Sequence, residues 1–442
     1  MRKIILTAFF ATPVTILVTA VIASTLLITT VAFAESAQKD VQATTKNNAD
    51  EMTLNLTPTT DSLSSPSTII PAAPSVNAKS YVLMDEQTGT IIAQKNENMS
   101  LPPASLTKLM DLYIIFDAIK HGTINLDDKV LISTKAWHTG GSRMFVKAGD
   151  QVPANLLIQG ITVQSGNDAT IALAEHVAGS EKSFVDMMNQ QAVRLGMTNT
   201  HFEDATGLPK DTHKTTAHDL AILTRAIIMD FPEQYHFFSE KWFTYAGIKQ
   251  PNRNRLLWRF KGADGLKTGH TEAAGYCLIT SAVRDNQRLI AIVLGAPTDN
   301  ERSADSIQLL TYGFRFYRTE KLYDALTPVV TTRVWKGENK ETPLGLAQPL
   351  YVTVPVGSKA LLKTSIQPNK DITAPIKKGN NYGTVTVSLT NKILATAPLV
   401  ALESNKEGGF FSGLSDDISK SVGHLFHKKD QSDNKSNESN QE

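Results

Sequence analysis

The stretch from Leu109 to Phe116 is the feature that most constrains the fold of this chain. It reads Leu-Met-Asp-Leu-Tyr-Ile-Ile-Phe, so apolar side chains point in nearly every direction around a helix. A helix that is apolar all round cannot lie on a surface, because other elements have to cover it on every side. The sequence therefore predicts a central, buried helix over about residues 104–120, inside a domain large enough to enclose it.

Strand and helix signals on both sides of this helix predict the layers that cover it. Residues 80–94 form a β-hairpin pattern, and residues 276–294 form a second, stronger pair of strands. Helical patterns run through residues 154–195 and 216–230, and Thr216-x-x-Asp219 at the start of the second is interpreted as a helix cap. Hairpins at both ends with helices between them favour an α/β (α+β) domain, in which helices cover an antiparallel sheet.

The N-terminus predicts export. Arg2 and Lys3 precede a long apolar stretch that ends in Ala-Phe-Ala at residue 34, which is the pattern of a secretory signal peptide over residues 1–34. The apolar run is also long enough to span a bilayer, so an uncleaved anchor is the alternative. Residues 35–77 are rich in Thr, Ser, Asn, Ala and Pro and contain no aromatic residue, which predicts a disordered linker.

The residue pattern changes in the C-terminal third of the chain. Short β-type runs separated by Gly, Pro and Asn turns predict a first domain over residues 78–326 and a small all-β domain over residues 327–403. Residues 404–429 carry apolar side chains at three- and four-residue spacing among charges. This predicts a terminal amphipathic helix that lies on a membrane surface or, alternatively, packs on the β domain. The polar residues 430–442 are predicted to be disordered.

Charge and cysteine content exclude several classes of function. The 442 residues include 44 Lys and Arg against 43 Asp and Glu, so no overall basic surface points to nucleic acid as a partner. Cys277 is the only cysteine, which excludes an intramolecular disulfide and a multi-cysteine zinc site, and its apolar neighbours predict a buried packing residue. The sequence has no His-Glu-x-x-His zinc motif and no glycine-rich phosphate loop. We therefore expect no metal and no cofactor.

Three short motifs carry the chemistry. Ser105-Leu-Thr-Lys108 opens the buried helix, Ser165-Gly-Asn167 lies between helical patterns, and Lys267-Thr-Gly269 comes just before the second strand pair. Each pattern is common by chance when taken singly. Together, in this order and context, they are a strong signal for a serine acyl transferase.

The spacing of the first motif suits a serine nucleophile. Three residues along a helix place Ser105 and Lys108 on one face, so the amine can reach the hydroxyl. Burial of Lys108 beside Lys267 is expected to lower its pKa and let it accept the serine proton. Free N–H groups at the helix start could also face a developing oxyanion. The alternative is structural: Ser105 only caps the helix, and Lys108 extends to solvent.

The motifs and their flanks closely resemble the low-molecular-mass penicillin-binding proteins that act as serine-type D-alanyl-D-alanine carboxypeptidases. The resemblance rests on residues 103–108, 163–169, 252–254 and 265–271, and it extends over about residues 76–428. It implies a β-lactamase/transpeptidase-like catalytic domain, followed by the C-terminal β domain and the terminal helix.

The resemblance also implies residue roles. Ser105 is similar to the acylated serine, Lys108 to its general base, and Ser165 to the hydroxyl that relays a proton to the leaving D-alanine. The implied substrate-binding residues are Asn167, which also holds Lys108, then Lys267, Thr268, Gly269, His270 as a second oxyanion donor through its N–H, and Arg253 and Arg302 near the substrate carboxylate.

The implied reaction removes the terminal D-alanine from peptidoglycan pentapeptides through an acyl-enzyme, without a cofactor. β-Lactams would acylate and inhibit the enzyme, which would sit on the periplasmic side of the bacterial inner membrane. A DD-endopeptidase or a β-lactamase on the same fold is the alternative, although the Glu-x-x-Leu-Asn segment of the latter is not found after Ser165-Gly-Asn167. A cell-wall scaffold with a decayed site is a third.

Overall fold

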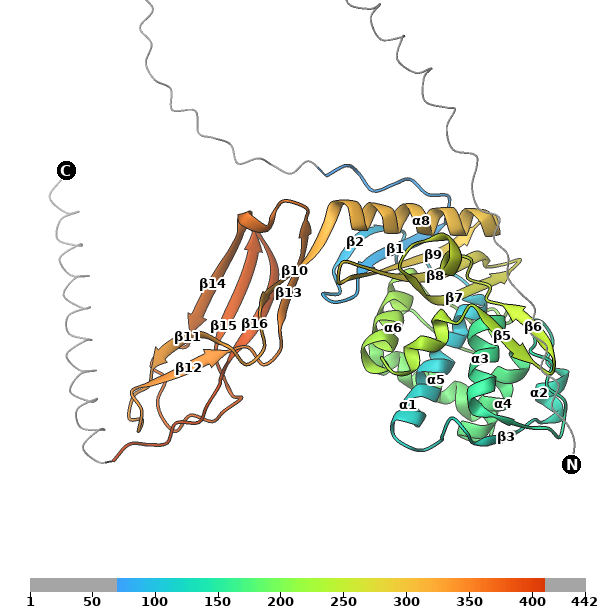
Figure 1. Cartoon of the computed structure of the whole chain (residues 1–442), viewed down its shortest axis with the longest axis horizontal. Helices are drawn as coiled ribbons and strands as arrows, with labels where there is room; N and C mark the ends of the chain where they lie inside the picture. Colours follow the sequence, from blue (N-terminus) through green and yellow to red (C-terminus); the bar gives the residue numbers. More distant parts are fainter. Residues whose placement is uncertain (1–69, 410–442) are drawn as a thin grey trace, which may run out of the picture. The chain divides into compact units, whose positions relative to one another are not determined.

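The computed structural model describes residues 70–409 (Figure 1). The signal peptide, the polar tail and nearly all of the linker and the terminal helix lie outside the described residues, so those predictions stay predictions. Among residues 70–409, no helix is both long enough and apolar enough to cross a membrane.

A five-stranded antiparallel sheet with the order β2-β1-β9-β8-β7 forms the centre of the first domain. Its strands are β1 (Ser80–Asp85), β2 (Ile91–Lys95), β7 (Ala263–Thr271), β8 (Gly275–Arg284) and β9 (Gln287–Ala296). Both predicted strand pairs are therefore confirmed and lie in one sheet. The turn between β8 and β9 consists of Asp285 and Asn286, whose φ angles of 49° and 61° are those a tight two-residue hairpin requires.

The strand β9 shows that this sheet separates two hydrophobic cores. Leu289 and Val293 pack in a cluster with α8 (Asp299–Phe316), whereas Ile290 and Ile292 pack in the larger cluster on the opposite face. Successive side chains of a strand point to opposite faces, so one strand fills both cores. Figure 1 shows α8 along one face of the sheet and the remaining long helices on the other.

Most of the other helices form the layer that contains the larger core. They are α1 (Lys108–Lys120), α2 (Thr134–His138), α3 (Ala154–Gln164), α4 (Asn167–Ala178), α5 (Glu181–Leu195) and α6 (Ala217–Asp230), with the 3-10 turns η1 (Ala104–Thr107) and η2 (Gln234–Ser239). The short α7 (Leu256–Arg259) packs on the α8 side instead, because its Leu256 belongs to the smaller cluster. The predicted pattern over residues 154–195 thus resolves into three helices. The hydroxyl of Thr216 accepts the N–H of Asp219 at 3.0 Å, which confirms the predicted cap of α6.

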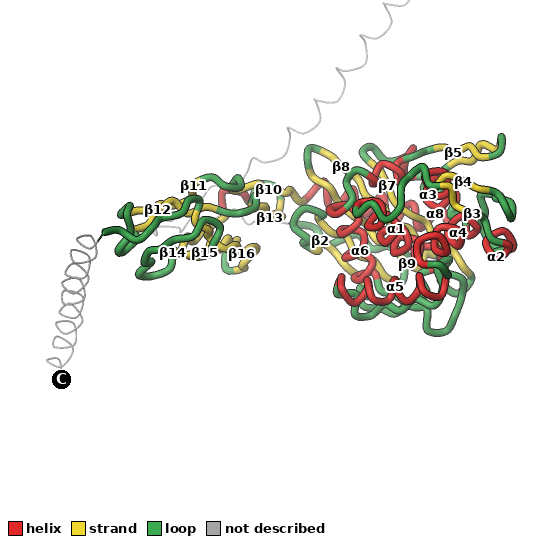
Figure 2. The backbone as a smooth tube through the Cα atoms, turned by 90° about the horizontal axis from the view of Figure 1, so that it is seen from below, coloured by secondary structure: helices red, strands yellow, loops and turns green. Residues whose placement is uncertain are grey.

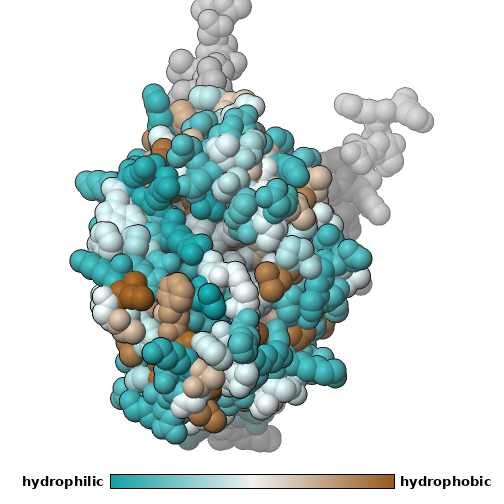
Figure 3. Space-filling view, turned by 90° about the vertical axis from the view of Figure 1, so that its right-hand side faces the viewer, coloured by the Kyte–Doolittle hydropathy of each residue, from teal (hydrophilic) through white to brown (hydrophobic). Residues whose placement is uncertain are grey.

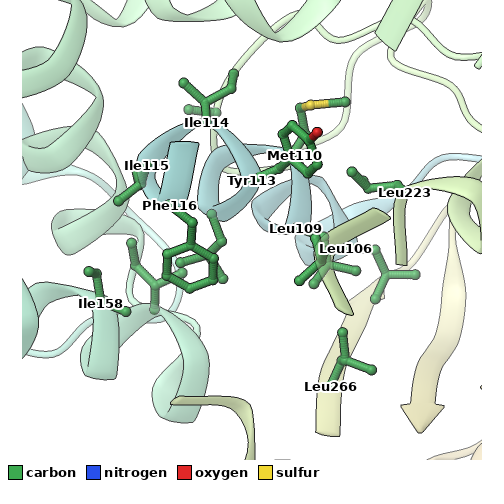
Figure 4. Packing of buried hydrophobic residues seen from close by; sticks show 14 of the residues in the cluster. Leu106, Leu109, Met110, Tyr113, Ile114, Ile115, Phe116, Ile158, Leu223 and Leu266 are labelled. Atoms are coloured by element: carbon green, nitrogen blue, oxygen red, sulfur yellow. The ribbon is translucent and has the colours of Figure 1, made fainter. Parts of the chain in front are cut away.

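The central helix is confirmed. Every residue of α1 from Lys108 to Phe116 is buried, and Figure 4 shows its side chains radiating on all sides, with Phe116 facing Ile158 of α3. The structure differs from the prediction in the first turn, because η1 is a 3-10 turn rather than part of the α-helix. The face shown in Figure 3 is mainly hydrophilic, and its apolar residues form small separate groups.

The C-terminal part is all-β, as predicted. A five-stranded sheet has the order β11-β12-β16-β15-β14, and β10 pairs with β13. The strands are β10 (Tyr317–Tyr323), β11 (Pro328–Arg333), β12 (Glu341–Gly345), β13 (Leu350–Pro355), β14 (Leu362–Pro368), β15 (Asn381–Leu389) and β16 (Lys392–Ala401), with the turn η3 (Lys359–Leu361). Val352 of β13, Val385 of β15 and Leu399 of β16 share one buried core. All α-helices of the described residues precede β10 in the chain, and in Figure 2 the part from β10 onward carries only strand labels. The predicted boundary after residue 326 stays a prediction.

Two short antiparallel strand pairs complete the first domain. The first is β3 (Lys129–Leu131) with β4 (Gln151–Pro153), and the second is the hairpin of β5 (Trp242–Tyr245) and β6 (Ile248–Pro251). The end of this hairpin is tied to α3, because the side-chain amide of Gln164 donates to the carbonyl of Pro251 at 2.6 Å. This bond places the chain after β6 beside Ser165, which ends α3.

Candidate active site

Ser105 lies in η1, the tight turn that opens the buried helix, and is partly exposed. The turn depends on a close approach by a second chain segment. Ala104 has a φ of 49°, and Gly207 (φ 81°) packs directly against its carbonyl. A Cβ atom on Gly207 would lie 1.8 Å from the oxygen of Ala104, so only glycine fits this position. The loop that contains Gly207 therefore packs directly against the turn that contains Ser105.

Lys108 contacts Ser105, as the motif predicts. Its side chain is fully buried, and its Nζ lies 3.3 Å from Oγ of Ser105 and donates to the carbonyl oxygen of Thr206 at 2.6 Å. Burial lowers the pKa of Lys108 to about 8, although the carboxyl groups of Asp111 and Asp204 oppose the shift. A lysine with this pKa exists partly as the neutral amine near neutral pH and can accept a proton from the serine. The alternative of a solvated Lys108 is wrong.

Lys267 lies on β7 and is also buried, with 2% of its side chain exposed. Its Nζ donates to the carbonyl oxygen of Thr268 at 3.0 Å. Burial lowers the pKa of Lys267 well below its usual range, and the positive charges of Lys108, Arg253 and Arg302 add to the shift. The site thus holds excess positive charge that an anionic ligand would relieve.

The glycine of the third motif lets β7 lie against the nucleophile turn. A Cβ atom on Gly269 would lie 3.1 Å from the carbonyl oxygen of Pro103, a tight contact that would push the turn and the strand apart by a few tenths of an ångström. Thr268 is 7% exposed, and the exposed ring of His270 lies 4.0 Å from the ring of Tyr276. Because β7 is an edge strand, alternate backbone N–H groups face away from β8 and are open to a ligand.

The second motif presents buried polar atoms without protein partners. Ser165 ends α3 with a φ of 61°, and its Oγ is buried and has no hydrogen-bond partner among residues 70–409. Asn167 opens α4; its Nδ2 donates to the carbonyl oxygen of Gly140 at 2.7 Å, and within the same residues its Oδ1 has no partner. The expected bond from Asn167 to Lys108 is not present, because the amine of Lys108 bonds Ser105 and Thr206 instead. Such atoms normally bind water or a ligand.

Arg253 is held between two buried asparagines. The Nδ2 of Asn254 donates to the carbonyl oxygen of Gly265 at 2.8 Å, and Oδ1 of Asn252 accepts the N–H of Asn254 at 2.8 Å. The backbone N–H of Arg253 donates to the carbonyl oxygen of Val163 at 3.3 Å, whereas its side chain is exposed. The Asn-Arg-Asn segment therefore links the second and third motifs and leaves the arginine open to a ligand.

Arg302 of α8 is 8% exposed and already has several partners. Its Nη1 donates to the carbonyl oxygens of Gly269 at 3.0 Å and Cys277 at 3.2 Å, and its Nη2 pairs with Asp299. The arginine thus ties α8 to the strands β7 and β8. Its contact with the substrate carboxylate stays a prediction. Cys277 is buried as predicted, and burial raises the pKa of its thiol to about 11, so the thiol stays protonated.

Several residues around the site were not recognised in the sequence. Thr206 supplies the carbonyl that binds Lys108, and Asp204 fixes its loop. Asp168 accepts the N–H groups of Met144 at 3.0 Å and Phe145 at 2.8 Å, which anchors the loop before α3. Asp204-Ala-Thr-Gly207 has the pattern of an Asp-initiated turn, so a signal for this loop was present.

Asp111 is a further unrecognised residue, one helical turn after Lys108. It is a lone acid in an otherwise apolar stretch and is fully buried. Burial raises its pKa well above the usual range, which favours the neutral acid. Among the described residues, no group of His, Cys, Asp and Glu has the arrangement of a metal site.

The arrangement suits acyl transfer. That reaction requires a nucleophile, a base and hydrogen-bond donors for the oxyanion. Here a serine at a helix start contacts a buried amine, and the edge strand β7 offers N–H groups beside positively charged side chains. Residues 67–298 match the family model described as D-alanyl-D-alanine carboxypeptidase. Residues 317–407 match the model of the penicillin-binding protein 5 C-terminal domain.

Characterised proteins and solved structures agree with these matches. The chain is 45% identical to D-alanyl-D-alanine carboxypeptidase DacC of Escherichia coli over 352 residues, which cover 78% of this chain and 88% of the relative. It is 41% identical to DacA of the same organism over 367 residues, or 81% and 91% of the two chains. The structure of penicillin-binding protein 5 from Haemophilus influenzae superposes with a TM-score of 0.73 at 39% identity, covering 76% of this chain and all of that one. This chain therefore belongs to the D-alanyl-D-alanine carboxypeptidase family of penicillin-binding proteins.

Proposed function

We propose that this protein is a serine carboxypeptidase that removes the terminal D-alanine from peptidoglycan peptides ending in D-Ala-D-Ala, through an acyl-enzyme on Ser105. One observation carries the proposal within this family: the fully buried amine of Lys108, with its pKa lowered to about 8, contacts Oγ of Ser105. The site therefore pairs a serine nucleophile with a base that is active near neutral pH.

In the proposed acylation step, Oγ of Ser105 attacks the carbonyl carbon of the penultimate D-alanine while Nζ of Lys108 accepts the serine proton. The backbone N–H of Ser105 and one from the edge strand near His270 stabilise the oxyanion. The C–N bond then breaks, and the proton held by Lys108 passes through the hydroxyl of Ser165 to the amine of the leaving D-alanine, so both residues return to their starting forms. The buried Oγ of Ser165, which lacks a partner within residues 70–409, supports this role. Water then hydrolyses the ester, with Lys108 again as the base.

The positive charge on the β7 side favours the C-terminal carboxylate of the substrate. In the proposed complex Lys267, Thr268 and the exposed Arg253 bind this carboxylate, and Oδ1 of Asn167 accepts a substrate N–H. Two observations support this arrangement: burial and the neighbouring positive charges lower the pKa of Lys267, and the side chain of Arg253 is exposed. Arg302 contributes through Gly269, whose carbonyl it binds at 3.0 Å.

β-Lactams carry a reactive amide and a carboxylate in a similar arrangement, so we propose that they acylate Ser105 and block the site. The same motifs would serve a β-lactamase or a DD-endopeptidase, and the assay below separates them. We also propose that the chain is exported through residues 1–34. Residues 404–429 then attach it to the periplasmic face of the inner membrane.

Release of free D-alanine from a pentapeptide ending in D-Ala-D-Ala tests the function. We expect turnover by the parent protein and none by Ser105→Ala, while Ser365→Ala, an exposed serine of β14, keeps full activity. Fast hydrolysis of penicillin with little D-alanine release would favour a β-lactamase. Cleavage of cross-linked dimers with no release from the pentapeptide would favour an endopeptidase. Acylation by penicillin without turnover of any peptide would leave only a binding role.

A further inference from the structure

A buried acid and a buried histidine lie behind the nucleophile helix, outside the three motifs. Asp204 is 7% exposed, and its Oδ1 accepts the N–H groups of Thr206 at 2.8 Å and Gly207 at 2.7 Å, as well as the hydroxyl of Thr206 at 2.9 Å. These bonds fix the backbone of the loop whose Thr206 carbonyl binds Lys108. Asp204 thereby determines where the amine of Lys108 is held.

The histidine extends this contact to the nucleophile turn. His213 is 1% exposed, and its Nε2 lies 3.0 Å from Oγ1 of Thr107. That hydroxyl donates its only proton to the carbonyl of Ala104 at 2.8 Å, so it has to accept the bond from Nε2–H of His213. The other ring nitrogen, Nδ1, lies 3.7 Å from Oδ2 of Asp204. Thr107 stands between Ser105 and Lys108 in the chain, so the histidine supports the turn that separates nucleophile and base.

We propose that Asp204 and His213 form a positioning pair that holds Lys108 against Ser105 from behind the nucleophile helix. One arm runs from Asp204 through Thr206 to the amine, and the other runs from His213 through Thr107 to the turn. The proposal rests on the carboxypeptidase function proposed above and adds two residues that support its nucleophile and base.

The charges around Lys108 determine what the pair does to the base. The charges are those of Asp111 of α1, Asp168 of α4, Asp204 of the loop, Arg253 of the segment after β6 and Lys267 of β7. Asp111 favours its neutral form because burial raises its pKa. Asp204 therefore supplies one of the negative charges that keep the pKa of Lys108 from falling further.

The surroundings of Asp204 keep it ionised. Burial opposes ionisation, but His213 and the N–H of Gly207 outweigh it and hold the pKa of Asp204 below its usual range. Nζ of Lys210 lies 3.7 Å from Oδ2 of Asp204. Two further acids lie in this region. Glu181 accepts the N–H of the adjacent Ala205 at 3.2 Å and pairs with Lys135 at 2.7 Å, and Glu203 accepts the N–H of Thr212 at 3.1 Å. Loss of the charge on Asp204 is therefore expected to lower the pKa of Lys108.

The first test is the Asp204→Asn variant, which keeps Oδ1 as an acceptor for the loop and removes only the charge. The readout is the rate of acylation of the full-length protein by a chromogenic penicillin as a function of pH, normalised to its plateau. We expect the rise of the rate with pH to move about 1 unit to lower pH, the low end of the effect of one nearby opposite charge. An unchanged profile, or a shift to higher pH, overturns the proposal.

Asp219→Asn is the matched control. Asp219 is also fully buried, accepts a backbone N–H from Asn199 at 2.9 Å and lies 3.6 Å from His218, but it is absent from the charges that act on Lys108. We expect its pH profile to match that of the parent. An equal shift in both variants would mean that any buried acid produces the effect, which also overturns the proposal.

His213 gives a second test that does not depend on the folding of Asp204→Asn. We expect His213→Ala to lower the plateau rate of acylation about tenfold, because a small misplacement of nucleophile and base is costly. His213→Gln keeps an N–H donor for Thr107 and should recover most of that loss. Parental acylation by His213→Ala overturns the proposal. Acylation by penicillin requires only the reaction at Ser105, so it can be measured without peptide turnover. A parent protein that is acylated but releases no D-alanine would refute the carboxypeptidase function, and the acylation rates of the His213 variants would still test the positioning pair.

Discussion

The Nζ of Lys108 lies 2.6 Å from the backbone oxygen of Thr206, nearer than the 3.3 Å that separates it from Oγ of Ser105. The carbonyl can only accept, so one N–H of the lysine has to point towards Thr206. In the neutral amine this bond helps to direct the lone pair, which cannot face the same carbonyl. The loop that carries Thr206 therefore orients the base as well as contacting it.

The first prediction concerns the pH dependence of acylation. The pKa of Lys108 is about 8 and only the neutral amine can accept a proton, so the rate should rise about tenfold per pH unit below 8 and level off above it. Acylation by a chromogenic penicillin, measured at constant ionic strength, checks this expectation. A rise centred below about pH 6.5 would assign the base to another group.

The second prediction separates stability from activity at Lys108. Its pKa is lowered from 10.5 in an unfolded chain to about 8, so the folded state carries a cost of about 3 kcal/mol below pH 8. This cost shrinks as the pH rises from 8 to 10.5 and vanishes above that range. Lys108→Met removes it but leaves the carbonyl of Thr206 without its donor, at about 1–3 kcal/mol.

We therefore expect Lys108→Met to lose acylation while remaining at least as stable as the parent at pH 7. Urea unfolding followed by circular dichroism measures the free energy of unfolding. The same comparison near pH 10 should show the parent gaining on the variant. A variant less stable than the parent by more than about 2 kcal/mol at pH 7 would contradict the cost assigned to burial.

The third prediction concerns Arg302. Because it donates to the carbonyls of Gly269 and Cys277, Arg302→Gln should loosen the edge of β7 and lower kcat/KM for the peptide about tenfold or more. If Arg302 supports the strand edge, the substitution should also lower the rate of acylation by penicillin and the melting temperature. If Arg302 only contacts the substrate, the melting temperature should stay unchanged. Arg255→Gln is the control, since this half-exposed arginine pairs with the same Asp299 and should change little.

The fourth prediction compares two glycines with similar backbone angles. Gly207 (φ 81°) touches the carbonyl of Ala104, whereas Gly196 (φ 78°) has open space where a Cβ atom would go. Gly196→Ala should cost only the strain of the left-handed conformation, about 1–2 kcal/mol. Gly207→Ala should cost clearly more and should also abolish acylation, because it displaces η1. Equal costs in thermal unfolding would contradict the close approach.

The fifth prediction concerns membrane attachment. If residues 404–429 hold the protein on the membrane surface and the signal is cleaved, a chain ending at residue 407 should appear in the soluble periplasmic fraction with full D-alanine release. The full-length protein should sediment with membranes and come off at high pH without detergent. Membrane association of the shortened chain would instead favour an uncleaved N-terminal anchor.

Sequence patterns predicted the parts of the fold that depend on local periodicity. The all-round apolar residues of α1 allowed only a central helix, and the strand pairs at residues 80–94 and 276–294 are both present. The two pairs join in one sheet through β1 and β9. This pairing could not be predicted, because the alternation of residues within one strand does not say which distant strand lies beside it. The 3-10 form of η1 was also missed, because it depends on packing against Gly207 and Gly269 rather than on local propensity.

The site shows the same division. The motifs identified Ser105 and Lys108, because an i, i+3 spacing on a helix is sufficient to place them together. Thr206 could not be found in this way, since it binds Lys108 through its backbone and any residue offers a carbonyl. Arg302 was expected near the substrate, yet its donors bind the strand edge, which only the placement of α8 on the sheet reveals.

The contact between Gly269 and Pro103 gives the apolar interior a role in the geometry of the site. Leu266 of β7 and Leu106 of η1 belong to the same buried cluster, and Figure 4 shows them on the side of α1 that faces the sheet. Both leucines therefore belong to the packing between η1 and β7, the same approach that brings Gly269 close to Pro103. The spacing of the Ser105 turn and the motif strand thus depends on the buried core as well as on the motif residues themselves.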